Sequence, residues 1–365
     1  MPADQKIGHL AENEGTLDMT TSWRPKTQMG RELAESPDVV AKQLVHNKAA
    51  IDTLATELRA NPPKFVVTCG RGSSDHATLY AKYLIESQLG IPVVSAAPSI
   101  VSIYNRTVAS KDALFIAVSQ SGKSPDLVKN AQAARDAGAR TVALVNVVDS
   151  PLADTVDHVI PLLAGPETSV AATKSYIATL SAIAQIVGAW TQDTSFNDGL
   201  SKLPNLLTSA LDQDWLGASD TIAKSDGLYV IGRGPAFAIA QEAALKFKET
   251  SSLHAEAFSA AEVKHGPMAL VTKTFPMLVF SQQDASRDSV EDFLTEMRGK
   301  TDNLFAAETG YADIKGHLPV VEDIHPLLAP IAMIQTFYTL AENVALARGC
   351  NPDAPPHLSK VTETH

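Results

Sequence analysis

The stretch "LFIAVSQSGKSPDLVKNAQAA", from Leu114 to Ala134, decides the fold. An apolar run reaches Val118 and then gives way to the polar segment Ser119-Gln120-Ser121-Gly122-Lys123-Ser124, after which apolar residues recur with helical spacing. This order predicts a buried strand, a short loop and a helix that begins at Pro125, for which Ser124 is a suitable N-cap. A strand, a loop and a helix in this order are typical of a parallel sheet covered by helices.

The same pattern recurs along the chain. Other β-like runs, mostly separated by helical segments, are "KFVVTC", "IPVVSA", "TVALVN", "HVIPLL", "DGLYVIG", "FPMLVFS" and "DNLFAAE". The segments "FVVTCGRGSSDHATLYAKYL" and "LYVIGRGPAFAIAQEAALKF" both predict a strand, a Gly-Arg-Gly turn and a helix, which indicates two copies of one domain. We therefore predict an α/β protein with two tandem domains, each a mainly parallel sheet flanked by helices. The predicted parts are a flexible N-terminal arm (1–28), a first domain (29–205), a second domain (206–348) and a C-terminal tail (349–365).

Composition narrows the class of protein. The chain has 365 residues, with 30 Lys and Arg against 41 Asp and Glu and a net charge of −11, whereas nucleic-acid binders usually carry a basic excess. Cys69 and Cys350 have no metal-type spacing and fit a reducing cytoplasm. The polar start of the sequence is not a signal peptide, and no apolar run approaches the length of a membrane span. We expect a cytoplasmic protein that binds neither nucleic acid nor a membrane.

The loop from Ser119 to Ser124 has the chemistry of an anion cradle. Backbone N–H groups and a positive helix end face the same point, serine hydroxyls add donors, and Gly122 lets the backbone approach a ligand. The loop lacks the glycine spacing of dinucleotide sites and P-loops, so it fits a sugar phosphate better. From this segment alone, an ordinary capped loop explains the residues equally well.

Other segments favour the phosphate interpretation. The motifs "CGRGSSDHA", "SQSGKSPD", "AGPETSVAATKSY", "GRGPAFAIAQEAALKFKETSSLHAEAF", "EVKHGPMALV" and "PPHLSKVTET" occur in this order. Together they closely resemble the sugar-isomerase (SIS) family, especially the isomerase half of glucosamine-6-phosphate synthase and the stand-alone SIS-type glucosamine-6-phosphate deaminases. The resemblance covers nearly everything from about residue 29 onward. It implies two SIS domains of flavodoxin-like, three-layer αβα architecture.

The resemblance also implies which residues hold the sugar phosphate. In this sequence they are Ser73, Ser74, Ser119, Gln120, Ser121 and Ser124. The family pattern usually has Gly-Glu-Thr where this chain has Gly122-Lys123-Ser124, so the hydroxyl is kept and Lys123 adds a positive charge.

The catalytic residues implied by the resemblance are Glu249, His265 and Lys360. Their chemistry is suitable: a carboxylate can move a proton between neighbouring carbons, a histidine can open a sugar ring, and a lysine can stabilise developing negative charge. Taken singly, these residues also suit a solvated helix face, a packed loop and a tail charge. Glu242 lies seven residues before Glu249, hence on the same helix face, and we expect it to support the site. Lys246 lies near that face and is expected to help orient the sugar.

The absence of a nucleophilic cysteine near Met1 decides the expected reaction. The synthase takes ammonia from glutamine through a preceding domain that starts on such a cysteine, whereas the first cysteine here is Cys69. We expect a glucosamine-6-phosphate deaminase that needs no metal or organic cofactor. The resemblance further implies a homodimer, in which one subunit lends its histidine loop to the other. The alternatives are a galactosamine-6-phosphate enzyme, a fructose-amine 6-phosphate deglycase, and a sugar-phosphate sensor without catalysis.

Overall fold

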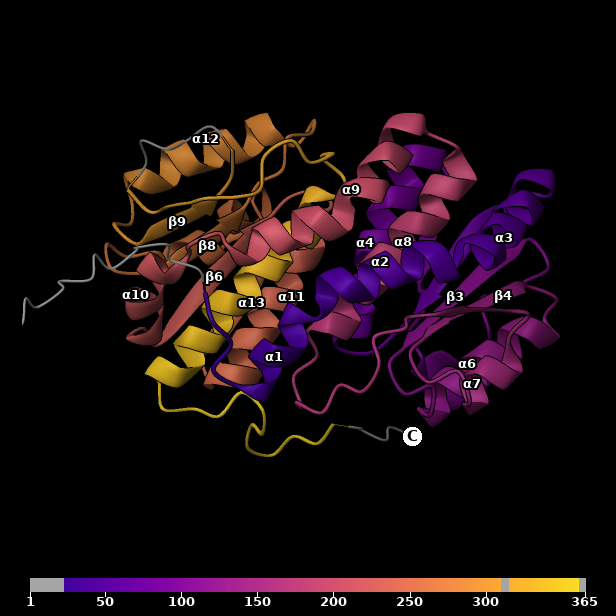
Figure 1. Ribbon diagram of the computed structural model, residues 1–365. Helices are drawn as coiled ribbons and strands as arrows, with labels where there is room; N and C mark the ends of the chain where they lie inside the picture. The colour runs from indigo at the N-terminus through magenta and orange to yellow at the C-terminus, as the bar shows by residue number, and fades with distance from the viewer. Residues whose placement is uncertain (1–22, 310–314, 361–365) are drawn as a thin grey trace, which may run out of the picture.

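The computed structural model describes residues 23–309 and 315–360, which form two α/β domains joined through a shared layer of helices (Figure 1). In the first domain, the described strands make one parallel sheet in the order β2-β1-β3-β4-β5. These strands are β1 (Phe65–Cys69), β2 (Val93–Ser95), β3 (Ala113–Ser119), β4 (Arg140–Val145) and β5 (His158–Pro161).

The central strand β3 is buried over its whole length, because helices cover both faces of the sheet. This explains why its sequence is a continuous apolar run rather than an alternating one. The helices of this part of the chain are α1 (Gln28–Ala34), α2 (Ser36–His46), α3 (Lys48–Ala60), α4 (Ser73–Leu89), α5 (Ser99–Ser102), α6 (Pro125–Asp136), α7 (Pro151–Thr155), α8 (Lys174–Thr191) and α9 (Thr194–Leu211).

The second domain repeats this topology. Its described strands form a parallel sheet in the order β10-β9-β8-β6-β7, so β6, β7, β8, β9 and β10 correspond to β1, β2, β3, β4 and β5. Their bounds are β6 (Gly227–Gly232), β7 (His254–Ser259), β8 (Met277–Phe280), β9 (Leu304–Ala307) and β10 (His317–Leu318). The helices are α10 (Ser219–Ala223), α11 (Ala236–Ser251), α12 (Arg287–Arg298) and α13 (Ala329–Ala347), with 3₁₀ turns at Leu216–Ala218, Glu262–His265 and Pro267–Leu270.

The two sheets share one large apolar core. Helices α4 and α8 of the first domain and α11 and α13 of the second lie between the sheets (Figure 1). Their apolar side chains form a single cluster with the inner faces of both sheets. Separate clusters lie under α6 and α7 on the outer face of the first sheet and under α12 on that of the second. Each domain is therefore a three-layer αβα unit, as the sequence predicts.

Two edge strands were not predicted. Strand β7 contains Glu256 and is mostly half-buried, so it lacks the apolar run of a central strand, and β10 is only two residues long. The loss of a sequence signal at a sheet edge is expected, because edge strands need fewer apolar residues.

The predicted division between the two domains, after residue 205, falls inside α9. Most of the expected flexible arm lies outside the described residues. Its described end is held firmly, because Glu342 of α13 accepts hydrogen bonds from the Trp23 indole at 2.8 Å and the Thr27 backbone N–H at 2.8 Å.

Candidate functional site

A pocket of about 350 Å³ opens at the carboxyl ends of β1 and β3, where the strand order of the first sheet reverses. Ligands of open α/β sheets bind at such a switch point. The first domain, α11 of the second domain and the C-terminal tail all contribute to its walls. The lining residues are Arg71, Gly72, Ser73, Ser74, Val118, Ser119, Gln120, Ser121, Ser124, Leu127, Val170, Ala172, Lys246, Glu249, Leu358, Ser359 and Lys360. Nine of the eleven residues predicted from sequence therefore lie around one pocket.

The loop after β3 has a conformation that requires glycine. Gly122 has a φ of +65°, and a Cβ at this position would clash with the side chain of Ser150. The Ser119 hydroxyl accepts the Gly122 N–H at 3.0 Å, which turns the loop tightly before Ser124, the N-cap of α6. The loop thus presents serine hydroxyls and the N-terminal end of a helix to the pocket, which suits an anion.

An ion pair joins this loop region to the turn after β1. The guanidinium of Arg71 donates to the Asp126 carboxylate at 2.9 and 2.6 Å, and Asp126 is almost completely buried at the start of α6. Arg71 comes from the Gly-Arg-Gly turn and was not among the residues predicted from sequence. It lines the pocket and links the turn after β1 to the start of α6.

A buried group of charges from α11 lines the opposite side. The ammonium of Lys246 pairs with Glu249 and lies 3.4 Å from the Glu242 carboxylate. Lys246 and Glu242 are fully buried, whereas Glu249 keeps an exposed fraction of 22% and reaches the pocket. Burial alone would lower the pKa of Lys246, but the two carboxylates outweigh it and raise that pKa.

Glu242 lies behind the pocket and connects three helices. Its carboxylate accepts from the Ser73 hydroxyl at 3.0 Å and the Tyr338 hydroxyl at 3.1 Å, and it contacts Nδ1 of His76 at 2.9 Å. Burial opposes ionisation, but Lys246 and the hydrogen bond with His76 outweigh it and hold the pKa of Glu242 below its ordinary value. His76, next to the hydroxyls in "GSSDHA", was missed because a single histidine on a helix carries no signal in the sequence.

The C-terminal tail closes the pocket through Lys360. The Lys360 ammonium is 2.9 Å from the Glu167 carboxylate, whose side chain is completely buried. Glu167 also accepts from the Thr173 and Ser175 backbone N–H groups at 3.0 and 3.1 Å, so it is fixed at the start of α8. Glu167 belongs to the predicted motif "AGPETSVAATKSY", but nothing in the sequence says that it meets the tail.

His265 does not lie in this pocket. It ends the 3₁₀ turn Glu262–His265 at the surface of the second domain and is exposed. Lys123 is also exposed and is not a lining residue of this pocket. Within a single chain, the structure therefore brings together Glu249 and Lys360 but leaves the predicted ring-opening histidine apart.

The described residues contain neither a metal-binding cluster nor a membrane-spanning helix. Within 23–309 and 315–360, no three His, Cys, Asp or Glu side chains are arranged to hold a metal ion. No helix in the described part of the chain is both long and apolar enough to cross a membrane.

Comparison with known proteins gives the family. The sequence profile described as "SIS domain" matches residues 62–189 and 221–306, and the chain belongs to this family. It is 30% identical over 341 residues to the glutamine–fructose-6-phosphate aminotransferase (isomerizing) of Sulfolobus acidocaldarius, covering 91% of this chain and 56% of that protein. The chain thus spans about half the length of the curated relatives it matches.

Solved structures extend the comparison. A Silicibacter pomeroyi protein assigned as a phosphosugar isomerase is 40% identical, with a TM-score of 0.84 over 90% of this chain and 100% of that one. The glucosamine-6-phosphate deaminase of Thermotoga maritima has a TM-score of 0.74 over 93% of this chain and 100% of that one, but is 20% identical, which is a likeness of fold.

The depressed pKa of Glu242 predicts a pH dependence of stability. A carboxyl whose pKa is lower in the folded state stabilises the fold above its unfolded pKa, and this contribution is lost as the pH falls through the folded value. We expect the free energy of unfolding to decline below pH 4.5, the ordinary value for Glu242. Glu32, whose pKa is also lowered, contributes to the same decline.

The variant Glu242→Gln measures how much Glu242 contributes to this pH dependence of stability. The variant should lose about 3–5 kcal/mol at pH 7, because it leaves the buried Lys246 with one carboxylate fewer. It should also show a shallower decline than the wild type between pH 5 and pH 3 in urea unfolding. The exposed Asp198→Asn is the matched control. Parallel stability profiles for wild type and Glu242→Gln would contradict the charge pairing.

Proposed function

We propose that the protein is an amino-sugar phosphate deaminase that converts glucosamine 6-phosphate and water to fructose 6-phosphate and ammonia. The observation that carries this proposal is one pocket with a hydroxyl-rich loop on one wall and the Glu249–Lys246 pair on the other. The loop suits a phosphate, and the acid with its buried cation suits proton transfer at the far end of the sugar.

Each step of the proposed reaction has a residue with suitable chemistry. The phosphate binds at the loop Ser119–Ser124, with Ser73 and Ser74 beside it at the start of α4. Once the sugar ring is open, Glu249 removes the proton from carbon 2 and returns it to carbon 1, which turns the amine into an imine. Lys246 pairs with the Glu249 carboxylate and holds it at the wall of the pocket. Water then adds to carbon 2, and ammonia leaves.

In this proposal Lys360 assists at the reacting carbons. It is a lining residue of the pocket, and its ammonium is held by Glu167. A cation at this position stabilises the negative charge that develops when carbon 2 loses its proton. Tail residues 358–360 also cover the pocket, which limits the access of water to the intermediate.

Ring opening requires a second subunit in this proposal. His265 is exposed on the second domain and lies outside the pocket of its own chain. In a homodimer with a two-fold axis, the histidine loop of one subunit reaches the pocket of the other. His265 then exchanges the proton between the ring oxygen and the carbon 1 hydroxyl.

An ammonia-release assay tests the function directly. The panel contains glucosamine 6-phosphate, galactosamine 6-phosphate, a fructose-amine 6-phosphate and unphosphorylated glucosamine. We expect release from glucosamine 6-phosphate and little from the unphosphorylated sugar. Preference for either of the other phosphates would change the substrate, and binding without ammonia release would identify a sensor.

Replacing the proposed base separates chemistry from binding. Glu249→Gln should lower kcat by about 10²–10⁴-fold while substrate affinity changes little, because the amide keeps the size but cannot take a proton. In deuterated water the wild type should place deuterium at carbon 1 of fructose 6-phosphate, and the variant should not. A folded variant with wild-type kcat would remove Glu249 from the reaction.

Replacing the loop hydroxyls should weaken the binding of the sugar phosphate. The double variant Ser119→Ala/Ser121→Ala should raise KM, because each hydrogen bond lost to a charged phosphate costs about 1.5–3 kcal/mol. The exposed Ser195→Ala is the matched control, since Ser195 lies at the start of α9, away from the pocket. An unchanged KM in the folded double variant would take the loop out of the site.

Mixing two inactive variants tests the shared site. In a heterodimer of Glu249→Gln and His265→Ala chains, one pocket has both substitutions and the other has neither. Random exchange of a 1:1 mixture should therefore recover about a quarter of wild-type activity. A site complete within one chain would recover none.

A further inference from the structure

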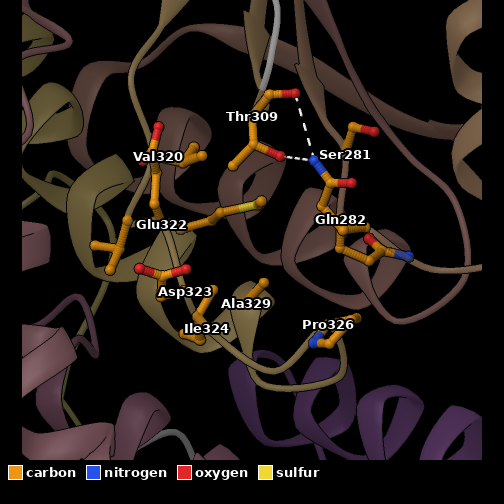
Figure 2. Close-up of a pocket in the computed structure, with 12 residues that line it drawn as sticks. Ser281, Gln282, Thr309, Val320, Glu322, Asp323, Ile324, Pro326 and Ala329 are labelled. Carbon is orange, nitrogen blue, oxygen red and sulfur yellow. Dashed lines mark hydrogen bonds between the residues drawn. The ribbon is translucent and has the colours of Figure 1, made fainter.

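A second cavity lies at the carboxyl ends of β8 and β9 in the second domain (Figure 2). It measures about 230 Å³, which is more than one water molecule needs. Its wall is largely apolar and includes Val320, Val321 and Ile324 of the loop after β10 and Ala329 and Met333 of α13. No lysine, arginine or histidine lines it, and it shares no lining residue with the sugar-phosphate pocket. The cavity is therefore a separate candidate site.

One buried acceptor in the wall of this cavity has no partner. Gln282 lines the cavity and is only 2% exposed. Its Nε2 donates to the Arg233 carbonyl at 3.0 Å and to the Asp284 carboxylate at 2.9 Å, and because both partners can only accept, the orientation of the amide is fixed. Its Oε1 lies on the other side of the amide and accepts no hydrogen bond from any described residue (Figure 2). A buried acceptor without a donor is costly, so a ligand that brings a donor is favoured.

The N-terminal end of α13, which borders the cavity, leaves few free donors for an anion. The N–H groups of Leu328 and Ala329 donate to the His325 carbonyl at 2.8 and 3.1 Å, and the Ile331 N–H donates to the Leu328 carbonyl at 2.9 Å. Pro330 has no N–H. Since no cationic side chain lines the cavity either, its wall suits a donor ligand better than an anion.

Two carboxylates give the cavity a negative rim. Glu322 and Asp323 line it, are exposed, and form no salt bridge with any described residue. A carboxylate at a similar place in the first domain holds an ammonium group. Glu167 stands seven residues before the start of α8 and Glu322 seven residues before the start of α13, each after the fifth strand of its domain. Glu167 lies 2.9 Å from the Lys360 ammonium, whereas Glu322 has no such partner.

We propose that this cavity binds a small primary amine in its protonated form. The ammonium group donates to Oε1 of Gln282, and the carboxylates of Glu322 and Asp323 attract its charge. A short alkyl body packs against the apolar wall formed by Val321 and Met333. The site does not depend on the proposed function of the sugar-phosphate pocket.

The buried carboxyl of Glu308 belongs to the other face of the sheet. In β9, Leu304 and Ala306 pack under α12, and by strand alternation Glu308 follows them, whereas the cavity borders α13. Burial raises the pKa of Glu308 to about 7, with the nearby Ser281 hydroxyl and Arg287 of α12 opposing this effect in part. Glu308 is not a lining residue, so the proposed ligand does not contact it.

Calorimetric titration of the full chain with n-butylammonium chloride tests the proposal. n-Butanol serves as a neutral probe of nearly the same shape, and NaCl keeps the ionic strength equal. We expect one n-butylammonium ion to bind per chain and n-butanol to bind more weakly. No binding of n-butylammonium, or equally tight binding of n-butanol, would overturn the proposal.

Three variants test the cavity itself. Glu322→Gln/Asp323→Asn should weaken n-butylammonium binding by about tenfold and leave n-butanol binding unchanged, because a charge near the surface attracts a cation only modestly. The matched control Asp136→Asn/Asp154→Asn removes two exposed carboxylates from α6 and α7 of the first domain and should change neither. Ala329→Leu fills the cavity and should abolish binding of both probes.

Glu249→Gln locates the bound amine. The Glu249 carboxylate also attracts cations, but in the sugar-phosphate pocket, so this variant should bind n-butylammonium as the wild type does. Loss of binding in Glu249→Gln, or unchanged affinity in folded Glu322→Gln/Asp323→Asn, would contradict the assignment. If Ala329→Leu does not fold, the double variant still decides, because both of its substitutions are at exposed positions.

Discussion

The buried ammonium of Lys246, held between Glu242 and Glu249, is the interaction on which the arrangement of this protein depends. A charge removed from water must be paired and hydrogen-bonded, and Glu242 meets this need by reaching Ser73 and His76 of α4 and Tyr338 of α13. The cluster therefore fixes α11 against both domains. It also leaves Glu249, the one partly exposed carboxylate of the cluster, facing the pocket.

Carboxylates also hold the first and last described segments of the chain beside the pocket. Asp353 of the tail accepts the backbone N–H groups of Gln28 and Met29 at 2.9 and 2.7 Å and so caps α1. Glu32 of α1 accepts from the Thr168 and Ser169 hydroxyls, in the loop that carries Glu167, and Glu167 holds Lys360. The start of the described chain, the loop before α8 and the tail thus form one continuous network beside the pocket. Lys360, although close to the C-terminus, is held in place by buried groups.

The two copies of the domain differ at the loop that follows their central strand. In the first domain the loop after β3 is open and meets a turn that carries the hydroxyls of Ser73 and Ser74. In the second domain Pro235 and Ala236 follow the equivalent glycine, and Gln282 donates to the Asp284 carboxylate within the loop. The helix after this second turn, α11, supplies its charged residues to the neighbouring domain. The pocket therefore draws on both copies of the domain, with loops from the first and helix α11 from the second.

Sequence reasoning predicted the two α/β domains and the loop because apolar runs, glycine turns and capped helices are local patterns. It could also place nine residues around one pocket, but only through the resemblance to the SIS family, since Lys246 and Glu249 alone look like a solvated helix face. It missed Arg71, His76 and Glu167, because each acts through a partner far away in sequence. The exposed position of His265 likewise depends on packing that no local pattern records.

The most direct test of the central claim is a crystal structure of the protein with a stable analogue of open-chain glucosamine 6-phosphate. The account predicts that the phosphate lies against Ser119, Ser121 and Ser124, with carbons 1 and 2 within reach of Glu249 and with Lys360 beside them. It also predicts that His265 of a second subunit approaches the carbon 1 oxygen. A phosphate bound at the second domain, or a sugar whose carbon 2 lies away from Glu249, would contradict the account.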